Sequence, residues 1–381
     1  MSLRHLIKFP SRILQATALW PKSNVSSVYK LRTFFTLGVI LSLTLCLTYN
    51  ATFHFNDFIQ LSESLFMLIS VFNTLMKVVM LYLNGKAFLR FLSMIEKPSF
   101  QNSVRLYGSI VEDVNNSVAN VNRCYKIQVN GTVLFMSLCP ALESKPLPMD
   151  FPHFNDGMFY YPFYVFETFS LCVAAYCNMA LDLLTVGVIS VATIQLKILN
   201  RNLVDTEKNV ENSGSLSEKD LEQLTLRYLN ECCSHYSDIE EFVTCLSQVL
   251  SINIFVQLGT SVVAICNSGI LILTVNPLSV EAVSLFFYIS TMLAQLGMYC
   301  WFGNFVYSES LEVTTSCYMS PWYQRGTPIR KTLFMLMERA KRPLQIKGIN
   351  FVTLSFNTFI AILKWSYSYF TLLRHYMMKN Q

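Results

Sequence analysis

Seven stretches of this 381-residue chain contain almost no charged side chains and approach or reach the length of a bilayer-spanning helix. Backbone groups find no water inside a bilayer, so uncharged runs of about 20 residues indicate transmembrane helices. The composition agrees, because 52% of the residues are hydrophobic and only 14% are charged, against about a quarter in soluble domains. We therefore expect an all-α membrane protein with seven spans at residues 34–53, 65–83, 127–142, 163–191, 251–275, 282–306 and 349–373.

The Lys and Arg residues predict the orientation of these spans. Of the 29 Lys and Arg residues, 24 lie in the N-terminal segment or in alternate loops, which predicts a cytoplasmic N-terminus and an extracellular C-terminus. Topology explains the net charge of +5 better than an acidic partner does, and no nucleic-acid partner is expected. The expected organisation is a cytoplasmic segment (1–33), spans one to four (34–191), a cytoplasmic loop with a helical extension (192–250), spans five and six (251–306), a cytoplasmic amphipathic helix (307–348), a last span (349–376) and an extracellular tail (377–381).

Two amphipathic helices are predicted on the cytoplasmic side. A polar stretch at 200–215 is expected to be a mobile loop, after which Ser215 and Glu218 form a capping box. The apolar pattern then continues without a break into span five, which predicts one long helix. Its polar face is acidic and the helix predicted at 329–342 is basic, so the two are expected to pack as a cytoplasmic anchor bundle. Two separate, solvated helices are the alternative.

Ionisable residues within the spans are candidates for function, because a charge at the centre of a membrane helix costs about 3 kcal/mol. They are Lys77, Glu167, Asp182 and Lys364. Lys77 and Asp182 both fall in the inner half of their spans and are candidates for a pair, although snorkelling of Lys77 to the interface explains its position equally well. Lys364 lies in the middle of the last span and is expected to point toward neighbouring helices.

The residues of this chain form no motif for catalysis, nucleotide binding or metal binding. The five histidines make no His-Glu-x-x-His and no pair at helical spacing, and the eleven cysteines include no Cys-x-x-Cys pair. Neither enzymatic activity nor a cofactor is expected. Asn50 is the only sequon residue that this topology places outside the membrane, so it is the candidate for glycosylation.

The C-terminal region contains a set of short segments at 303–304, 316–323 (Ser-Cys-Tyr-Met-Ser-Pro-Trp-Tyr), 330–331, 337–340, 343–344 and 366–373. Together these segments resemble the C-terminal signature of insect odorant receptors. The sibling gustatory receptors end in Thr-Tyr, five residues and Gln-Phe, of which this chain keeps only Tyr369, so the odorant branch is favoured over a gustatory-type channel.

This resemblance implies an odorant-gated, non-selective cation channel in the plasma membrane of an olfactory sensory neuron. Four copies of the last helix would surround the conduction path, and an odour-tuned subunit would assemble with a shared odorant co-receptor (Orco type) as a heterotetramer. Aligned from Tyr369, the last-helix pattern places Leu372 and Tyr376 at the hydrophobic constriction and His375 at a neighbouring polar position. A metabotropic, G-protein-coupled-like chemoreceptor is an alternative, but it needs an outside N-terminus, which the Lys and Arg distribution opposes.

The resemblance also implies an odorant pocket within one subunit, in the outer half of the membrane between spans two, three, four and six. The projected residues are mostly apolar with a few hydroxyls, which suits a small, volatile, weakly polar ligand. Ordinary core packing is the alternative for each of them. They are Phe66, Ile69, Ser70, Asn73, Leu134, Phe135, Leu138, Cys139, Phe169, Cys172, Val173, Tyr176, Phe287, Ser290, Thr291 and Ala294.

Overall fold

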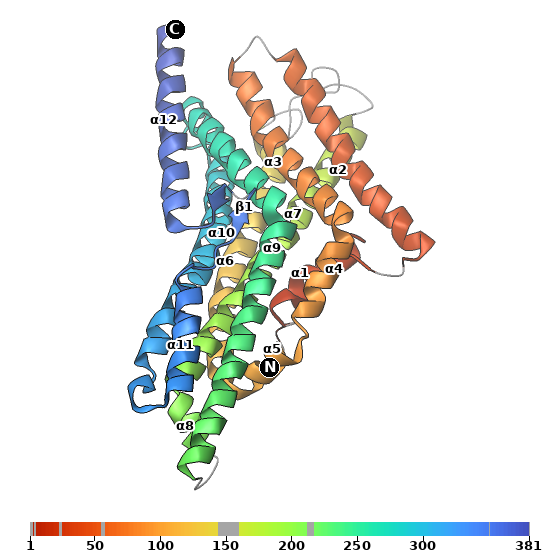
Figure 1. The fold of residues 1–381 in the computed structure, drawn as a ribbon. Coiled ribbons are helices and arrows are strands. Elements are labelled where there is room, and N and C mark those ends of the chain that lie inside the picture. The colour runs from red at the N-terminus through yellow and green to blue at the C-terminus, as the bar shows by residue number, and fades with distance from the viewer. Residues whose placement is uncertain are drawn as a thin grey trace.

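Long helices make up almost all of the fold, and most of them run along the long axis of the molecule (Figure 1). The computed structural model describes residues 3, 5–22, 25–54, 58–143, 160–211, 217–349 and 351–380. The elements are α1 (His5–Ala16), α2 (Ser27–Phe53), α3 (Phe58–Leu83), α4 (Gly85–Met94), α5 (Pro98–Leu106), α6 (Gly108–Glu143), α7 (Tyr160–Val204), α8 (Thr206–Glu211), α9 (Glu218–Thr274), α10 (Val280–Met319), a 3₁₀ turn (Trp322–Gln324), α11 (Thr327–Ala340), β1 (Lys347–Gly348), β2 (Val352–Thr353) and α12 (Phe356–Asn380).

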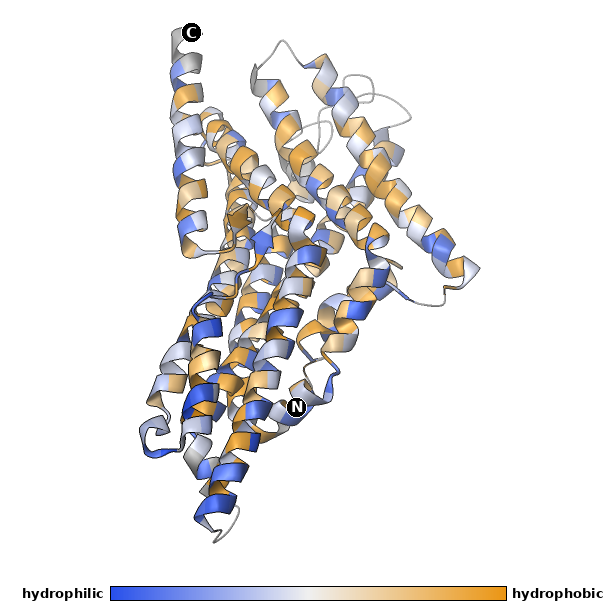
Figure 2. Ribbon diagram, viewed as in Figure 1, coloured by the Kyte–Doolittle hydropathy of each residue, from blue (hydrophilic) through white to orange (hydrophobic). Residues whose placement is uncertain are grey.

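By length and composition alone, five helices among the described residues are apolar enough to cross a membrane. They correspond to expected spans one, two, four, five and six. The third and seventh expected spans lie in α6 and α12, where polar residues such as Gln128 and Lys364 interrupt the apolar sequence. Figure 2 shows hydrophilic residues gathered at the end of the molecule that holds α8, α11 and the start of α9. The five helices are Ser27–Phe53, Gln60–Leu83, Tyr160–Val204, Glu218–Thr274 and Val280–Gln324.

Four helices, α6, α7, α9 and α10, continue well past the expected spans. α9 is one unbroken helix of 57 residues, or about 85 Å, against a hydrocarbon core of about 30 Å, so the predicted long extension is confirmed. Its N-cap is Ser217 rather than Ser215, which lies outside the described residues.

The loop expected at 200–215 is wrong for residues 200–211, where α7 ends at Val204 and α8 follows. Helix persists there because Leu203 is fully buried and Tyr228 donates a hydrogen bond to Asn202 Oδ1 at 3.0 Å.

The last helix begins at Phe356, seven residues later than the expected start of span seven at residue 349. The intervening segment forms a small antiparallel hairpin in which Lys347 pairs with Thr353 and Gly348 with Val352. Glycine at 348 lets the hairpin approach α9 closely, since a Cβ there would lie 3.1 Å from the backbone nitrogen of Phe255. The hairpin therefore anchors the start of α12 against α9.

The amphipathic helices α9 and α11 pack against each other within this chain. Arg339 of α11 donates hydrogen bonds to Glu240 and, at 3.2 Å, to Ser237 of α9. The buried side of α9 holds Phe242, which stacks on Phe91 with ring centroids 4.7 Å apart. Packing of the acidic helix on the basic helix is thus as predicted.

A single histidine is buried in the extension of α9, before the expected fifth span. The Nε2 of His235 lies 2.9 Å from Oε1 of Gln195, and its ring packs edge-on against Phe100. Burial lowers the pKa of His235 to about 4, although the charge of Asp238 acts in the opposite direction. The folded bundle therefore holds a neutral imidazole.

The predicted pair of Lys77 and Asp182 forms at the centre of the bundle. Nζ of Lys77 on α3 lies 2.5 Å from Oδ1 of Asp182 on α7, and both side chains are almost completely buried. Asp182 also accepts hydrogen bonds from Tyr125 of α6 at 2.7 Å and from Gln295 and Tyr299 of α10 at 2.5 and 2.9 Å. Four helices thus meet at one carboxylate.

The polar cluster continues from Asp182 to α9. Nε2 of Gln295 lies 3.1 Å from Oε1 of Gln257, and Asn73 of α3 donates to the same Oε1 at 2.7 Å. We call the nine residues that these bonds connect the buried polar cluster. They are Asn73, Lys77, Tyr125, Asn178, Asp182, Gln257, Ser261, Gln295 and Tyr299.

Two polar residues differ from expectation. Lys364 is exposed on α12, so its expected packing against neighbouring helices is wrong for the helices of its own chain. Asn50 is only 2% exposed and its Nδ2 donates to Ser64 Oγ at 3.1 Å. The structure therefore contradicts Asn50 as a glycosylation site, because the amide nitrogen is occupied and covered.

Removing one partner of the buried ion pair should destabilise the protein strongly. Lys77→Met or Asp182→Asn alone leaves an uncompensated polar group, which typically costs about 3–5 kcal/mol. The double variant should lose much less than the sum of the two single variants. Thermal unfolding in detergent measures this, with the exposed Lys364→Met as the matched control. Additive losses would contradict the pairing.

Acidification should destabilise the α9 extension through His235. Its folded pKa of about 4 lies below the ordinary value of 6.5, so the stabilisation is complete above pH 6.5 and is lost as the pH falls toward 4. The loss should reach about 1 kcal/mol near pH 5.5. His235→Gln should flatten this part of the stability-against-pH curve in a detergent melt, and the exposed His5→Gln should not. An unchanged curve in His235→Gln would refute the assignment.

Candidate functional site

A cavity of about 80 Å³ lies between α3, α6, α7 and α10. These are the four helices between which the odorant pocket was expected. Most of the wall is apolar, and three of its residues are the flexible methionines Met67, Met136 and Met292. The lining residues are Met67, Ser70, Val71, Thr74, Tyr125, Val129, Thr132, Val133, Met136, Leu171, Ala174, Ala175, Asn178, Tyr288, Thr291 and Met292.

The hydroxyl groups of the wall direct their protons into the protein. Thr74, Thr132 and Thr291 donate to backbone carbonyls of their own helices at 3.0, 3.0 and 2.8 Å. Tyr288 donates to the carbonyl of Phe66 at 2.9 Å and lies 2.5 Å from Ser70 Oγ. These hydroxyls therefore present acceptor oxygens, rather than free donors, to a ligand.

One end of the cavity is part of the buried polar cluster. Tyr125 lines the cavity and donates to Asp182 at 2.7 Å. Asn178 also lines the cavity, and its Oδ1 accepts a hydrogen bond from Lys77 Nζ at 2.9 Å. A molecule in the cavity would thus touch side chains that are bonded directly to the ion pair.

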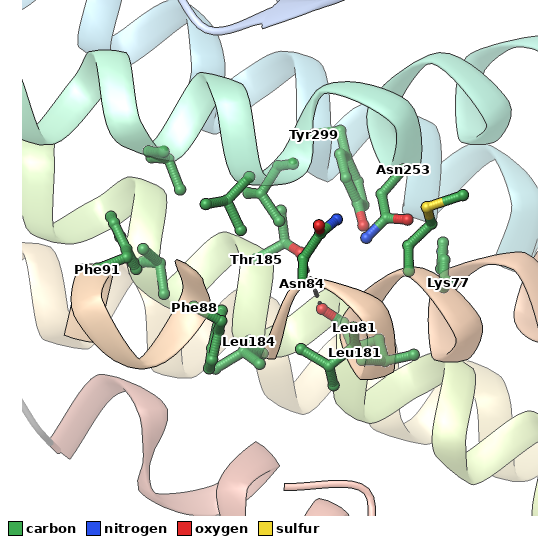
Figure 3. Close-up of a pocket in the computed structure, with 15 residues that line it drawn as sticks. Lys77, Leu81, Asn84, Phe88, Phe91, Leu181, Leu184, Thr185, Asn253 and Tyr299 are labelled. Atoms are coloured by element: carbon green, nitrogen blue, oxygen red, sulfur yellow. Dashed lines mark hydrogen bonds between the residues drawn. The ribbon is translucent and has the colours of Figure 1, made fainter. Parts of the chain in front are cut away.

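A second, smaller cavity of about 30 Å³ lies on the other side of the cluster, toward the α9 extension. Figure 3 shows Lys77, Asn253 and Tyr299 at one end of it and Phe88 and Phe91 at the other. Its volume holds about one or two water molecules and is too small for an odorant. The larger cavity is therefore the candidate ligand site.

Among the projected pocket residues whose side chains the structure describes, only Ser70 and Thr291 line the larger cavity. Phe66 lies behind its wall, with its ring edge-on to Tyr288 at 5.1 Å. Asn73 belongs to the buried polar cluster instead, through its bond to Gln257.

The remaining projected residues of α3 and α10 pack inside the bundle. Ile69 and Ala294 are half-buried against the hydrophobic core, and Ser290 accepts a hydrogen bond from Gln128. Phe287 stacks on Phe135 of α6 with centroids 5.0 Å apart. These side chains support the cavity wall or lie outside it.

The projected residues on α6 and α7 whose side chains are described do not line the cavity. Leu134 and Phe169 are 54% and 49% exposed, on the outer surface of the bundle. Tyr176 is 37% exposed and its hydroxyl donates to Oδ1 of Asn130 at 2.9 Å. Cys172 and Val173 are half-buried. The side chains of Leu138 and Cys139 lie outside the described part of the structure.

The predicted constriction residues lie near the end of α12. Leu372 is 64% exposed and His375 is also exposed. The side chain of Tyr376 is outside the described residues. One side of α12 packs on α9, where Ser366 donates to the carbonyl of Val262 at 3.4 Å, so Leu372 faces away from its own subunit.

Sequence reasoning missed the polar end of the cavity. Tyr125 lies outside the predicted span three, because the charged Lys126 set the start of that span at residue 127. In the structure, α6 is continuous from Gly108 and includes Tyr125. Asn178 was overlooked although it is an amide within the apolar run 163–191. A polar residue at the fourth position before Asp182 on the same helix face was the available signal.

The fold is shared with an insect receptor of known structure. The olfactory receptor OR5 from Machilis hrabei superposes with a TM-score of 0.84 over 98% of both chains, at 15% sequence identity, in a structure with eugenol bound. A second structure of the same receptor superposes with the same TM-score over 97% of this chain. The architecture is therefore the seven-transmembrane fold of that receptor.

Sequence relatives point to the same group. Odorant receptor 10 of Aedes albopictus is 26% identical over 48% of this chain and 46% of its own length. Odorant receptor Or2 of Anopheles gambiae is 30% identical over 38% of both chains, and odorant receptor 63a of Drosophila melanogaster is 25% identical over 70% of this chain and 60% of its own. The match thus spans half or less of the first two relatives. The family model described as 7tm Odorant receptor matches residues 57–367, and the chain therefore belongs to the insect odorant receptor family.

Proposed function

We propose that this chain is the odour-tuned subunit of an odorant-gated, non-selective cation channel. The observation that carries the proposal is the mostly apolar cavity between α3, α6, α7 and α10, in a chain of this family. Small volatile molecules are bound by shape and dispersion in such sites. The related receptor from Machilis hrabei holds eugenol, which is a molecule of this kind.

The cavity has to expand to admit a ligand. Its volume of about 80 Å³ is well below the usual range of about 300–1,000 Å³ for small-molecule sites. Met67, Met136 and Met292 are unbranched and change rotamer at low cost, so they are the residues that move aside. The ligand then stabilises the expanded arrangement by contacts that the closed one lacks.

Ion conduction is assigned to α12. One side of α12 carries aromatic and aliphatic residues that are more than half exposed in the single subunit, namely Trp365, Tyr369 and Leu372. Copies of this helix from four subunits, one or more of them an odorant co-receptor (Orco type), would enclose a path for cations. Leu372, with Tyr376, then forms an apolar ring that closes the path by dewetting, and His375 lies beside it.

The N-terminus is assigned to the cytoplasm of a plasma-membrane protein. The end of the molecule that holds α8, α11 and the start of α9 is rich in hydrophilic residues (Figure 2). The Lys and Arg residues of the chain lie mostly in the loops assigned to that side. α9 and α11 on this side form the anchor through which subunits contact one another. This orientation is opposite to that of a G-protein-coupled receptor.

Co-expression should reveal the channel directly. Cells with this chain and an insect odorant co-receptor should carry fast cation currents during puffs of a broad volatile panel, with G-protein signalling blocked by a non-hydrolysable GDP analogue. Cells with this chain alone should stay silent. Whole-cell patch clamp measures both, and currents that the block abolishes would replace the proposal with a metabotropic receptor.

Filling the cavity should weaken the response to volatiles. Ala175→Phe adds a ring at the cavity wall, so half-maximal concentrations should rise at least about tenfold, which corresponds to 1.4 kcal/mol. Val165→Phe, on the 65% exposed side of the same helix, is the matched control and should respond normally. Dose-response curves recorded at equal surface expression compare the half-maximal concentrations of both variants with that of the wild type. An unaltered response in Ala175→Phe would place the ligand elsewhere.

A further inference from the structure

We infer that Asn178 is the hydrogen-bond donor of the ligand cavity, and that the cavity selects volatiles that carry an acceptor oxygen, such as ketones, aldehydes and esters. This inference rests on the proposed function, because it deepens the account of the same cavity. It assigns a specificity-determining role to a residue of α7 that lies beside the buried ion pair.

The orientation of the Asn178 amide follows from its neighbour. Lys77 Nζ lies 2.9 Å from Oδ1 of Asn178. A lysine ammonium has three donors and no acceptor, so the amide has to turn its oxygen toward it. Lys77 is itself held by Asp182 at 2.5 Å, and the ion pair therefore fixes which end of the amide is left for the cavity.

The nitrogen of the amide is the unused donor of the cavity. Among the described residues, Nδ2 of Asn178 makes no hydrogen bond, although Asn178 lines the cavity. The hydroxyls of Thr74, Thr132 and Thr291 already donate to backbone carbonyls of their own helices, and Tyr125 donates to Asp182. The hydroxyls of Ser70 and Tyr288 donate to the carbonyl of Phe66. An acceptor oxygen on a ligand thus has one partner in this wall, the amide nitrogen of Asn178.

The position of Asn178 also connects recognition to the rest of the bundle. A ligand oxygen on Nδ2 strengthens the acceptor character of Oδ1 toward Lys77, since hydrogen bonds in a chain polarise one another. Lys77 and Asp182 in turn bind groups on α6 and α10. Binding of an acceptor ligand therefore stabilises the junction of four helices, whereas a hydrocarbon in the same cavity acts through packing alone.

Matched ligand pairs test the inference in the assembled channel. Cells with this chain and the co-receptor receive methyl ketones and esters, each paired with the alkane or alkene of the same shape and size. The wild type should need about tenfold less of the acceptor-bearing member for a half-maximal current, as expected for one hydrogen bond of about 1.4 kcal/mol. Asn178→Leu should bring this ratio close to one, mainly by weakening the responses to ketones and esters.

Thr48→Val is the matched control, because it removes a hydroxyl on α2, away from the cavity wall, whose proton is bound to the carbonyl of Thr44 at 2.8 Å. Its ratio should equal that of the wild type. Should Asn178→Leu fail to reach the cell surface, Asn178→Ser shortens the side chain with less disturbance and should lower the ratio in the same way.

The outcomes separate this inference from the proposed function. Absence of current for every volatile, with normal surface expression, would overturn the proposed function. Currents with equal sensitivity to both members of each pair in the wild type would overturn only the role of Asn178. A wild-type preference that survives in Asn178→Leu or Asn178→Ser would also overturn it, because the donor would then lie elsewhere.

Discussion

The buried ion pair between Lys77 and Asp182 is the interaction on which the arrangement of the central helices depends. Each charge inside a dry bundle would cost several kcal/mol if it lacked partners. Asp182 meets this requirement with four donors, which come from Lys77 on α3, Tyr125 on α6, and Gln295 and Tyr299 on α10. A shift of any of these helices along its axis would leave the carboxylate short of a donor, so the pair fixes their register.

The same pair separates two cavities with different surroundings. The larger cavity ends at Tyr125 and Asn178, and the smaller one begins at Lys77 and Tyr299. Ligand contacts at one end of the cluster are thus bonded, through Gln295 and Gln257, to α9. Because α12 packs along α9, the cluster forms a continuous physical connection between the proposed ligand site and the proposed pore helix. Such a connection makes coupling possible, and double-variant measurements quantify it.

The sequence predicted those features that depend on local pattern. Uncharged runs located the long helices, apolar periodicity predicted the unbroken α9, and the isolated charges at Lys77 and Asp182 predicted a pair. The lining of the cavity was mostly missed, because helix rotation decides whether Leu134 or Val133 faces inward, and a single sequence does not contain that rotation. The start of α12 was also misplaced, since the hairpin at Lys347–Gly348 forms through contacts with α9 that are distant in sequence.

The central claim is that a volatile molecule opens a cation path within the assembly of this chain and its co-receptor. The most direct test is an outside-out membrane patch, which exposes the extracellular face and replaces the cytosol with a nucleotide-free solution. Brief pulses of an active volatile should open unitary cation channels within milliseconds, and the openings should persist for as long as the patch survives. Loss of the response on excision, with whole-cell responses intact, would show that a soluble cytoplasmic messenger carries the signal and would contradict the account.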